Sequence, residues 1–149
     1  WAIAGHSIGG VMAARYAAGH PETIRGLALW AAYPEADVDL SSWTGTTTSV
    51  FGTLDGLTSV EDIEDSRARL PSDTSFVTIE GGNHAYFGWY GDQRGDNEAT
   101  ITRLDQQSIT VDATARVIGM RLQKLRRFSR MDSDLCSGKK KPISSRRSS

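Results

Sequence analysis

Apolar and polar positions follow one another in blocks along residues 1–120, and the blocks predict strands that alternate with helices. Four short runs are rich in apolar and β-branched residues, which is typical of strands in a sheet: 1–4, 24–32, 47–54 and 74–80. The run 24–32 is almost continuously apolar, as a strand buried on both faces requires. This alternation indicates an α/β fold with a mainly parallel sheet flanked by helices.

The segments between the strands carry signals for helix starts and ends. Residues 8–18 predict a helix, which Gly19 and Pro21 end. Thr58 and Glu61 have the spacing of a capping box, and they predict a helix that runs to Leu70. A closing helix is predicted from about residue 102, because apolar residues recur there at steps of three and four: Leu104, Val111, Ala115, Ile118, Leu122 and Leu125.

The charge is divided unevenly along the 149 residues. Residues 1–120 carry a net charge of −9 and residues 121–149 one of +8, although the whole chain is close to neutral at −1. Such a division is typical of an acidic folded body with a basic tail. We therefore expect a single domain over 1–125, and a disordered tail rich in Ser, Lys and Arg over 126–149.

Other features limit the classes of protein that the sequence fits. Cys136 is the only cysteine, so an intrachain disulfide is excluded, and the sequence has no N-x-S/T sequon. Both facts favour the cytoplasm without excluding secretion. No apolar run is long enough to span a membrane. The basic run 139–141 lacks interleaved aromatic residues, so we expect no nucleic-acid partner. Oligomeric state stays open.

The segment Gly5-His6-Ser7-Ile8-Gly9 contains the strongest chemical signal. It reads G-x-S-x-G between a predicted strand and a predicted helix, and this sharp turn exposes a serine hydroxyl for nucleophilic attack. Glycines on both sides are expected because the turn leaves little room for side chains. His6, at the first x position, is expected to be a packed neighbour of the serine.

Two further polar residues follow strands at the end where active groups gather in a parallel sheet. Asp55 follows the third predicted strand and His84 follows the fourth. A histidine near neutral pKa can take the proton of a serine, and a carboxylate can orient the histidine. The order Ser, Asp, His differs from that of the chymotrypsin and subtilisin classes. Asp37 and Asp39, which follow the second strand, are alternatives for the acid.

The motifs around these residues resemble those of the α/β-hydrolases. Segments 51–56 (FGTLDG) and 79–85 (IEGGNHA) are similar to the acid and histidine motifs of the small-lid branch that includes dienelactone-hydrolase-like proteins. The loop 87–91 and the segment 95–100 are similar as well. The resemblance covers about residues 1–120. It implies the carboxy-terminal half of an α/β-hydrolase fold, with the amino-terminal strands missing.

The resemblance also implies roles for individual residues. Ser7 would be the nucleophile, His84 the base and Asp55 the acid, and the backbone N–H of Ile8 would be one donor of the oxyanion hole. The second donor of the family lies on an earlier loop, which this sequence does not contain. The aromatic residues beside His84 could line an acyl pocket or could pack the loop against the body: Tyr86, Phe87 and Trp89.

The sequence therefore predicts a serine hydrolase that cleaves an ester or a related acyl bond through an acyl-enzyme. Its partner would be a small acyl substrate, because only about 12 residues separate the second and third strands and leave no room for a large lid. Neither a metal nor an organic cofactor is implied. Acyl transfer or thioester cleavage by the same triad is one alternative. A truncated, catalytically silent domain that acts as a binding piece is another.

Overall fold

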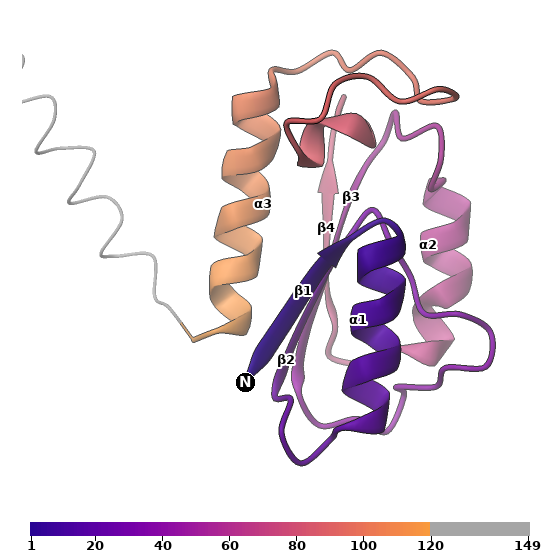
Figure 1. The fold of residues 1–149 in the computed structure, drawn as a ribbon, viewed down its shortest axis with the longest axis vertical. Helices are drawn as coiled ribbons and strands as arrows, with labels where there is room; N and C mark the ends of the chain where they lie inside the picture. Colours follow the sequence, from indigo (N-terminus) through magenta and orange to yellow (C-terminus); the bar gives the residue numbers. More distant parts are fainter. Residues whose placement is uncertain (120–149) are drawn as a thin grey trace, which may run out of the picture.

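The computed structural model describes residues 1–119, which form one parallel sheet with helices on both faces (Figure 1). The four strands lie in the order β1-β2-β3-β4, and every neighbouring pair is parallel. The α/β class and the parallel sheet predicted from the sequence are thereby confirmed. The strands are β1 (Ala2–His6), β2 (Gly26–Trp30), β3 (Thr46–Gly52) and β4 (Ser75–Ile79).

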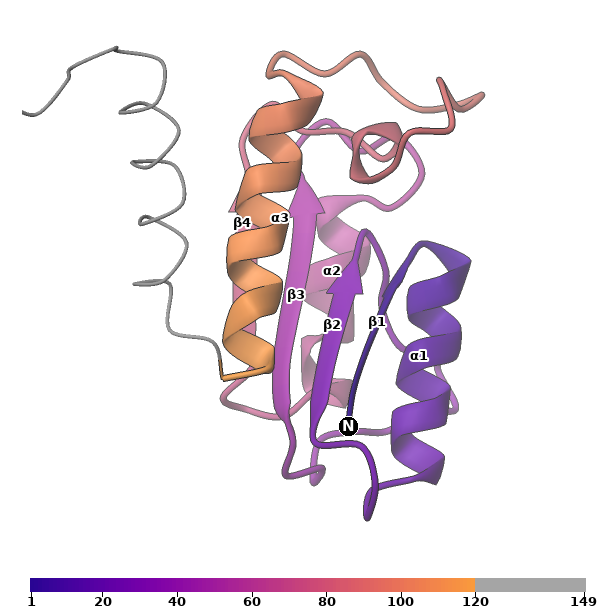
Figure 2. The same ribbon diagram turned by 60° about the vertical axis from the view of Figure 1, so that its left-hand side comes forward.

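The helices cover the two faces of the sheet unequally. The helix α1 (Ile8–Gly19) and the short helix α2 (Val60–Ser66) lie on one face, and α3 (Arg103–Val117) lies on the other, as Figure 2 shows. Short 3₁₀ turns follow α2 and β4, at Arg67–Arg69 and Ala85–Phe87. All strands point the same way, so their carboxyl ends meet at one end of the molecule, near the loop after β4 (Figure 1).

Two apolar clusters hold the layers together. On the α1 face, Ala14 and Ala17 pack with Leu27 and Leu29 of β2, and all four are fully buried. On the α3 face, the cluster is built around Val50, Ile79, Phe87 and Ala113. Alternate residues of the central strands thus face opposite helical layers, which explains why the run 24–32 is apolar at almost every position.

The predicted capping box of the second helix is displaced by one residue. Ser59, not Thr58, precedes the helix: its hydroxyl accepts from Asp62 N–H, and the Asp62 carboxylate accepts from Ser59 N–H. Thr58 is buried and donates its hydroxyl to the carbonyl of Ala31 at 3.1 Å. The sequence offers two adjacent hydroxyl residues, and a contact 27 residues away occupies the first of them.

The apolar stripe predicted for the closing helix is wrong for three of its four described members. Leu104 is 69% exposed, Val111 56% and Ile118 54%, and only Ala115 is buried. The face of α3 that packs on the sheet instead carries small and polar side chains: Gln106, Thr110, Ala113, Ala115 and Val117. Gln106 is buried on this face because its side chain bonds the backbone of the loop after β4, accepting from Asn83 N–H and donating to Asn83 C=O.

Some of the sequence predictions concern residues that the structure does not describe. Leu122 and Leu125 of the predicted stripe, and the basic tail 126–149, lie outside the described residues. Among residues 1–119, no helix combines the length and the apolar character that crossing a bilayer requires.

Candidate active site

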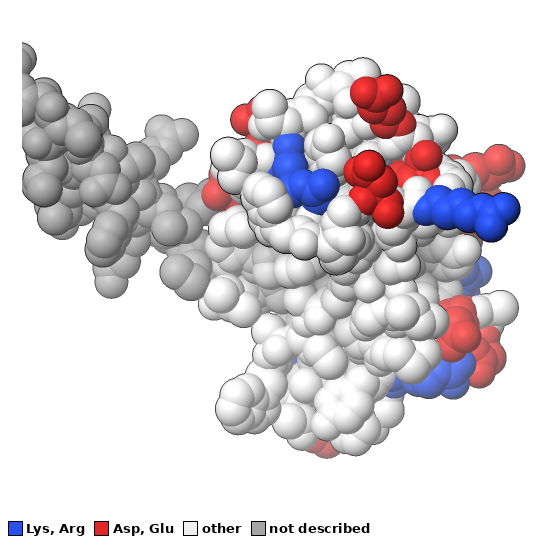
Figure 3. Space-filling view, turned by 45° about the horizontal axis from the view of Figure 1, so that its top comes forward, with Lys and Arg blue, Asp and Glu red and all other residues white. Residues whose placement is uncertain are grey.

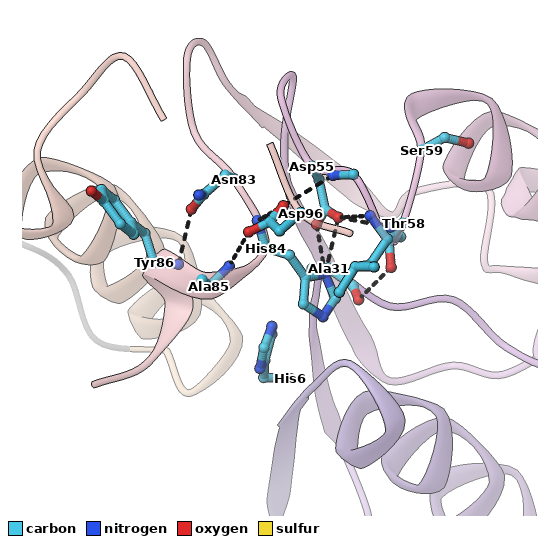
Figure 4. Close-up of polar contacts among 12 residues, drawn as sticks. His6, Ala31, Asp55, Thr58, Ser59, Asn83, His84, Ala85, Tyr86 and Asp96 are labelled. Atoms are coloured by element: carbon cyan, nitrogen blue, oxygen red, sulfur yellow. Dashed lines mark hydrogen bonds and ion pairs between the residues drawn. The ribbon is translucent and has the colours of Figure 1, made fainter. Parts of the chain in front are cut away.

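The three residues predicted to act together all follow strands at the carboxyl end of the sheet. Ser7 comes directly after β1, Asp55 comes three residues after β3, and His84 comes five residues after β4. Figure 4 shows His84 between Asp55 and His6, with the polar contacts that hold the acid and histidine loops together. The described chain thus brings the three segments together at one end of the fold, as strand-end placement predicts.

Ser7 occupies a strained backbone position. Its φ is 54° and its ψ is −128°, which is uncommon for a residue with a side chain. Its N–H donates to the carbonyl of Trp30 at 3.0 Å, and its own carbonyl accepts from Gly10 and Val11 in the first turn of α1. The strand and the helix therefore fix the backbone of the serine from both sides.

The glycines around Ser7 do not have equal roles. A Cβ on Gly5 would clash with the backbone of Gly9 and would lie 2.5 Å from Gly10 N, whereas a Cβ on Gly9 would have no neighbour within 4 Å. Gly10 is also crowded, since a Cβ there would lie 2.5 Å from the Ala32 side chain. The steric requirement for glycine that was predicted at both motif positions therefore holds at Gly5 and does not hold at Gly9.

A cavity of about 230 Å³ lies beside the serine, lined by Ser7, Ile8, Val11, Ala31, Ala32, Tyr33 and Thr58. Ile8 is the first residue of α1, so its N–H belongs to the turn in which amides lack an intrahelical acceptor. Its side chain is 71% exposed. The cavity wall thus combines apolar side chains with a free helix N-terminus, which is suited to an acyl group with a polarised carbonyl.

Asp55 and His84 form a buried hydrogen-bonded pair. The imidazole Nδ1 lies 2.8 Å from Asp55 Oδ2 and 3.0 Å from Oδ1. Only 1% of the His84 surface and 8% of the Asp55 surface is exposed. Because a carboxylate only accepts, Nδ1 carries the hydrogen, and in the neutral imidazole Nε2 then has the lone pair. In the part of the chain that the structure describes, Nε2 has no hydrogen-bond partner.

Local backbone bonds hold the Asp55 carboxylate in position. Its Oδ1 accepts from Leu57 N–H at 2.9 Å and from Thr58 N–H at 2.7 Å, which forms an Asx turn directly after β3. The two alternative acids lie elsewhere. Asp37 pairs with Arg15, which lowers the pKa of the carboxyl, and Asp39 accepts from Ser41 N–H. The geometry therefore favours Asp55.

His6 packs against the imidazole of His84. The two ring centroids are 4.5 Å apart, and His6 also stacks on Phe87 and on Tyr90, whose hydroxyl lies 2.9 Å from His6 Nδ1. Burial, followed by the nearby His84, lowers the pKa of His6 from 6.5 to about 4. Burial also raises the pKa of Tyr90. His6 is therefore a neutral, packed neighbour of the site, as expected from its place in the motif.

Ser7 and His84 lie on neighbouring segments but are not joined by a hydrogen bond in the described structure. Among residues 1–119, no hydrogen bond joins Ser7 Oγ to the imidazole, although the adjoining residue His6 touches that ring. Bonds between a nucleophile and its base are often long without substrate and shorten in the reacting complex. The described geometry thus has a formed acid–base pair and a serine on the neighbouring strand end.

The three aromatic residues predicted to bind substrate lie in different surroundings. Phe87 is 8% exposed and packs in the core cluster of the α3 face. Trp89 is 74% exposed and donates its indole N–H to Gln107, and the Arg103 guanidinium lies over the rings of both Tyr86 and Trp89. None of the three lines the cavity beside Ser7. Substrate binding by these residues stays a prediction.

Two polar residues near the pair were not singled out as site residues from the sequence. Thr58 lines the cavity beside Ser7, and its N–H donates to Asp55 in the turn after β3. The sequence signal for that turn is the pair Asp55-Gly56. Asp96 bonds the backbone on both sides of the acid–histidine pair. The sequence indicates its segment, 95–100, only through the family resemblance.

A larger cavity, of about 400 Å³, adjoins the loop of His84, and Ser7 is not among its lining residues. Its lining includes Asn83, Tyr86, Asp92, Asp96 and Glu98. Figure 3 shows acidic side chains at this end of the molecule and a broad uncharged surface below them. Among residues 1–119, no three His, Cys, Asp or Glu side chains are grouped to hold a metal ion.

Comparisons with known proteins agree with this fold. A model of the alpha/beta hydrolase family matches residues 1–108. An alpha-beta serine hydrolase homologue from Coxiella burnetii has a similar structure, with a TM-score of 0.53 and 17% sequence identity. The likeness covers 74% of this chain and 48% of that chain, so this chain spans about half the length of that protein. At this identity the likeness shows the fold. No curated protein matches the sequence.

Proposed function

The chain belongs to the alpha/beta hydrolase family, and from this premise we propose that it is a serine hydrolase that cleaves an ester or a related acyl bond. The observation that carries the proposal is the hydrogen bond between His84 Nδ1 and the Asp55 carboxylate, at 2.8 Å. This bond orients a buried imidazole so that, in its neutral form, Nε2 has the lone pair that a general base needs.

The proposed reaction proceeds through an acyl-enzyme. Ser7 Oγ attacks the substrate carbonyl carbon while His84 Nε2 takes the hydroxyl proton. The carbonyl π electrons move to the oxygen, and Ile8 N–H donates to the oxyanion. The intermediate collapses, the bond to the leaving group breaks, and His84 protonates that group. Water then attacks the acyl-enzyme with His84 again as base, which releases the acid and restores Ser7.

The electrostatics of the site support these roles. Asp55 stabilises the imidazolium that forms when His84 takes the serine proton, and the pair lies almost wholly out of water. The strained backbone of Ser7 supports its role as nucleophile, because it places the residue at the start of α1, beside the amides of the first turn. Family members place the second oxyanion donor on a loop outside residues 1–119.

A fluorophosphonate probe tests the proposal directly. We expect it to label the wild-type chain at Ser7 and to leave Ser7→Ala unlabelled. The matched control is Ser41→Ala, an exposed serine whose loss should leave labelling unchanged. Labelling that survives in Ser7→Ala would contradict the role of Ser7. An absence of labelling in every variant would favour a catalytically silent domain.

The substrate class can be tested with the same protein. The connection between β2 and β3 is short, so we expect short acyl esters to be cleaved faster than long-chain triglycerides. Faster cleavage of the triglycerides would exclude a small, accessible substrate. Acyl transfer and thioester cleavage use the same triad, and they are separated by product analysis with an added alcohol and with a thioester.

A further inference from the structure

The carboxylate of Asp96 lies between the acid loop and the histidine loop and bonds the backbone of both. Its Oδ1 accepts from Gly56 N–H at 3.0 Å, from His84 N–H at 3.1 Å and from Asn97 N–H at 3.0 Å. Its Oδ2 accepts from Ala85 N–H at 2.8 Å. One side chain therefore joins the residue after Asp55 to His84 itself, as the dashed lines in Figure 4 show.

The backbone of the acid loop lies directly against the segment that carries Asp96. A Cβ on Gly56 would clash with Gly95 C=O and would lie 2.9 Å from the Cα of Asp96. Gly95 has a φ of +92°, which glycine adopts without strain. The Asp-Gly pair of the acid loop is thus more than a turn signal, because Gly56 also gives Asp96 access to the loop.

A second set of bonds fixes the same segment to the histidine loop. Asn83 donates its side-chain N–H to the carbonyl of Asn97 at 2.7 Å and accepts from Tyr86 N–H at 3.0 Å. The buried Gln106 holds the backbone of Asn83 through both its N–H and its carbonyl. The segment of Asp96 is therefore anchored on α3 and cannot move without moving the loop of His84.

We propose that Asp96 is a positioning residue that holds the backbones of the Asp55 and His84 loops at the separation their hydrogen bond needs, a role that rests on the proposed function. Four N–H donors converge on two oxygens, and only a carboxylate offers acceptors on both sides. In Asp96→Asn, the amide oxygen can keep the three donors of Oδ1. The amide NH₂ then faces Ala85 N–H, so two donors oppose each other.

The test compares Asp96→Asn with Asp92→Asn, an equal change of charge at an exposed aspartate of the same loop. The readout is the proton NMR signal of the His84 Nδ1–H, which a short bond to Asp55 moves to low field. We expect this signal in the wild type and in Asp92→Asn, and its loss or broadening in Asp96→Asn. A signal that persists unchanged in Asp96→Asn overturns the proposal, even if that variant is less stable.

Kinetics with a short acyl ester give a second readout. A misplaced base lowers kcat on the order of 10²-fold with little change in KM, because the serine cavity is untouched. An equal loss in Asp92→Asn, or a loss confined to KM, would contradict the positioning role. The NMR signal does not depend on turnover, so a chain that proves inactive would refute the proposed function without deciding the role of Asp96.

The wild type alone gives a third measurement if Asp96→Asn does not fold. The amides of Gly56 and Ala85 should exchange with deuterium slowly at neutral pH, because each donates a hydrogen bond to the Asp96 carboxylate. Fast exchange of both amides at neutral pH would show that the Asp96 bridge does not hold the loops, and it would overturn the proposal.

Discussion

The acid–base half of the candidate site and its nucleophile half are built in opposite ways. Asp55 and His84 follow strands whose loops are held by side-chain bonds to backbone amides, and both are buried. Ser7 follows β1, which pairs only with β2 in the described sheet, and it is fixed by a strained backbone between a strand and a helix. In the proposed reaction, a hydrogen-bond network would thus organise proton transfer, and a steric turn would organise nucleophilic attack.

The difference also explains which half is complete. The described residues satisfy both oxygens of Asp55 and the Nδ1 of His84, so the hydrogen bonds of this half are formed without substrate. The nucleophile half has a strained serine, the N–H of Ile8 as its proposed oxyanion donor, and a neighbouring cavity of about 230 Å³. The two halves should therefore respond differently to mutation. Changes in the acid–base half should lower kcat, and changes in the nucleophile half should lower the free energy of unfolding.

The change with the largest expected effect is Asp55→Asn, which breaks the acid–base half. The amide oxygen can still accept from Thr58 N–H, so its NH₂ then faces His84 Nδ1 and holds the imidazole in the wrong tautomer. With Nε2 protonated, the base cannot accept the serine proton. We expect kcat to fall on the order of 10³–10⁴-fold with KM little changed.

The control for this change is Asp37→Asn, which removes an exposed carboxylate paired with Arg15. Steady-state kinetics with a short acyl ester measure both variants. An Asp55→Asn enzyme that keeps wild-type kcat, or an equal loss in Asp37→Asn, would show that the pair seen at 2.8 Å is not the working acid and base.

The next change tests the nucleophile half. In Gly5→Ala, the new methyl group meets the backbone of Gly9, which cannot rotate away as a side chain can. We expect a loss of about 3 kcal/mol in the free energy of unfolding, the upper part of the range for overpacking. Gly9→Ala is the matched control: it has open space and lies in a helix, where alanine is favoured by about 1 kcal/mol. Urea unfolding separates the two, and equal effects would contradict the steric account of the turn.

The sequence was informative where chemistry depends on neighbours along the chain. The strands were predicted because apolar and β-branched residues are concentrated in them, and Asp55 and His84 because strand ends meet at one end of a parallel sheet. It failed where burial is polar or contacts are distant. Gln106 is buried because it bonds Asn83, and Asp96 joins Gly56 across 40 residues, which no local pattern indicates. Leu104 looked like core and is exposed because that face of α3 has no cover in the described structure.

A third prediction concerns the support of the histidine loop by α3. In Gln106→Ala, the buried N–H and carbonyl of Asn83 lose their partners, which costs about 2 kcal/mol in the free energy of unfolding. Leu104→Ala, two residues earlier on the exposed face, should change it by less than about 0.5 kcal/mol. Urea unfolding measures both. A larger loss in Leu104→Ala would restore the apolar stripe that the sequence predicted.

The smallest expected effect is the pH dependence at the contact between the two halves, where His6 lies beside His84. The pKa of His6 is lowered from its ordinary value of 6.5 to about 4 in the fold. Burial, which disfavours the charged form, is the main cause, and the nearby His84 is the second. The charges of Asp55 and Asp96 oppose this shift. Between these values the unfolded chain binds more protons, so stability must rise with pH and fall as pH drops from 6.5 to 4. His6→Phe keeps a ring against His84 and removes the titration. We expect the urea midpoint of the wild type to fall more steeply across this window than that of His6→Phe, and parallel curves would show that His6 carries no such penalty.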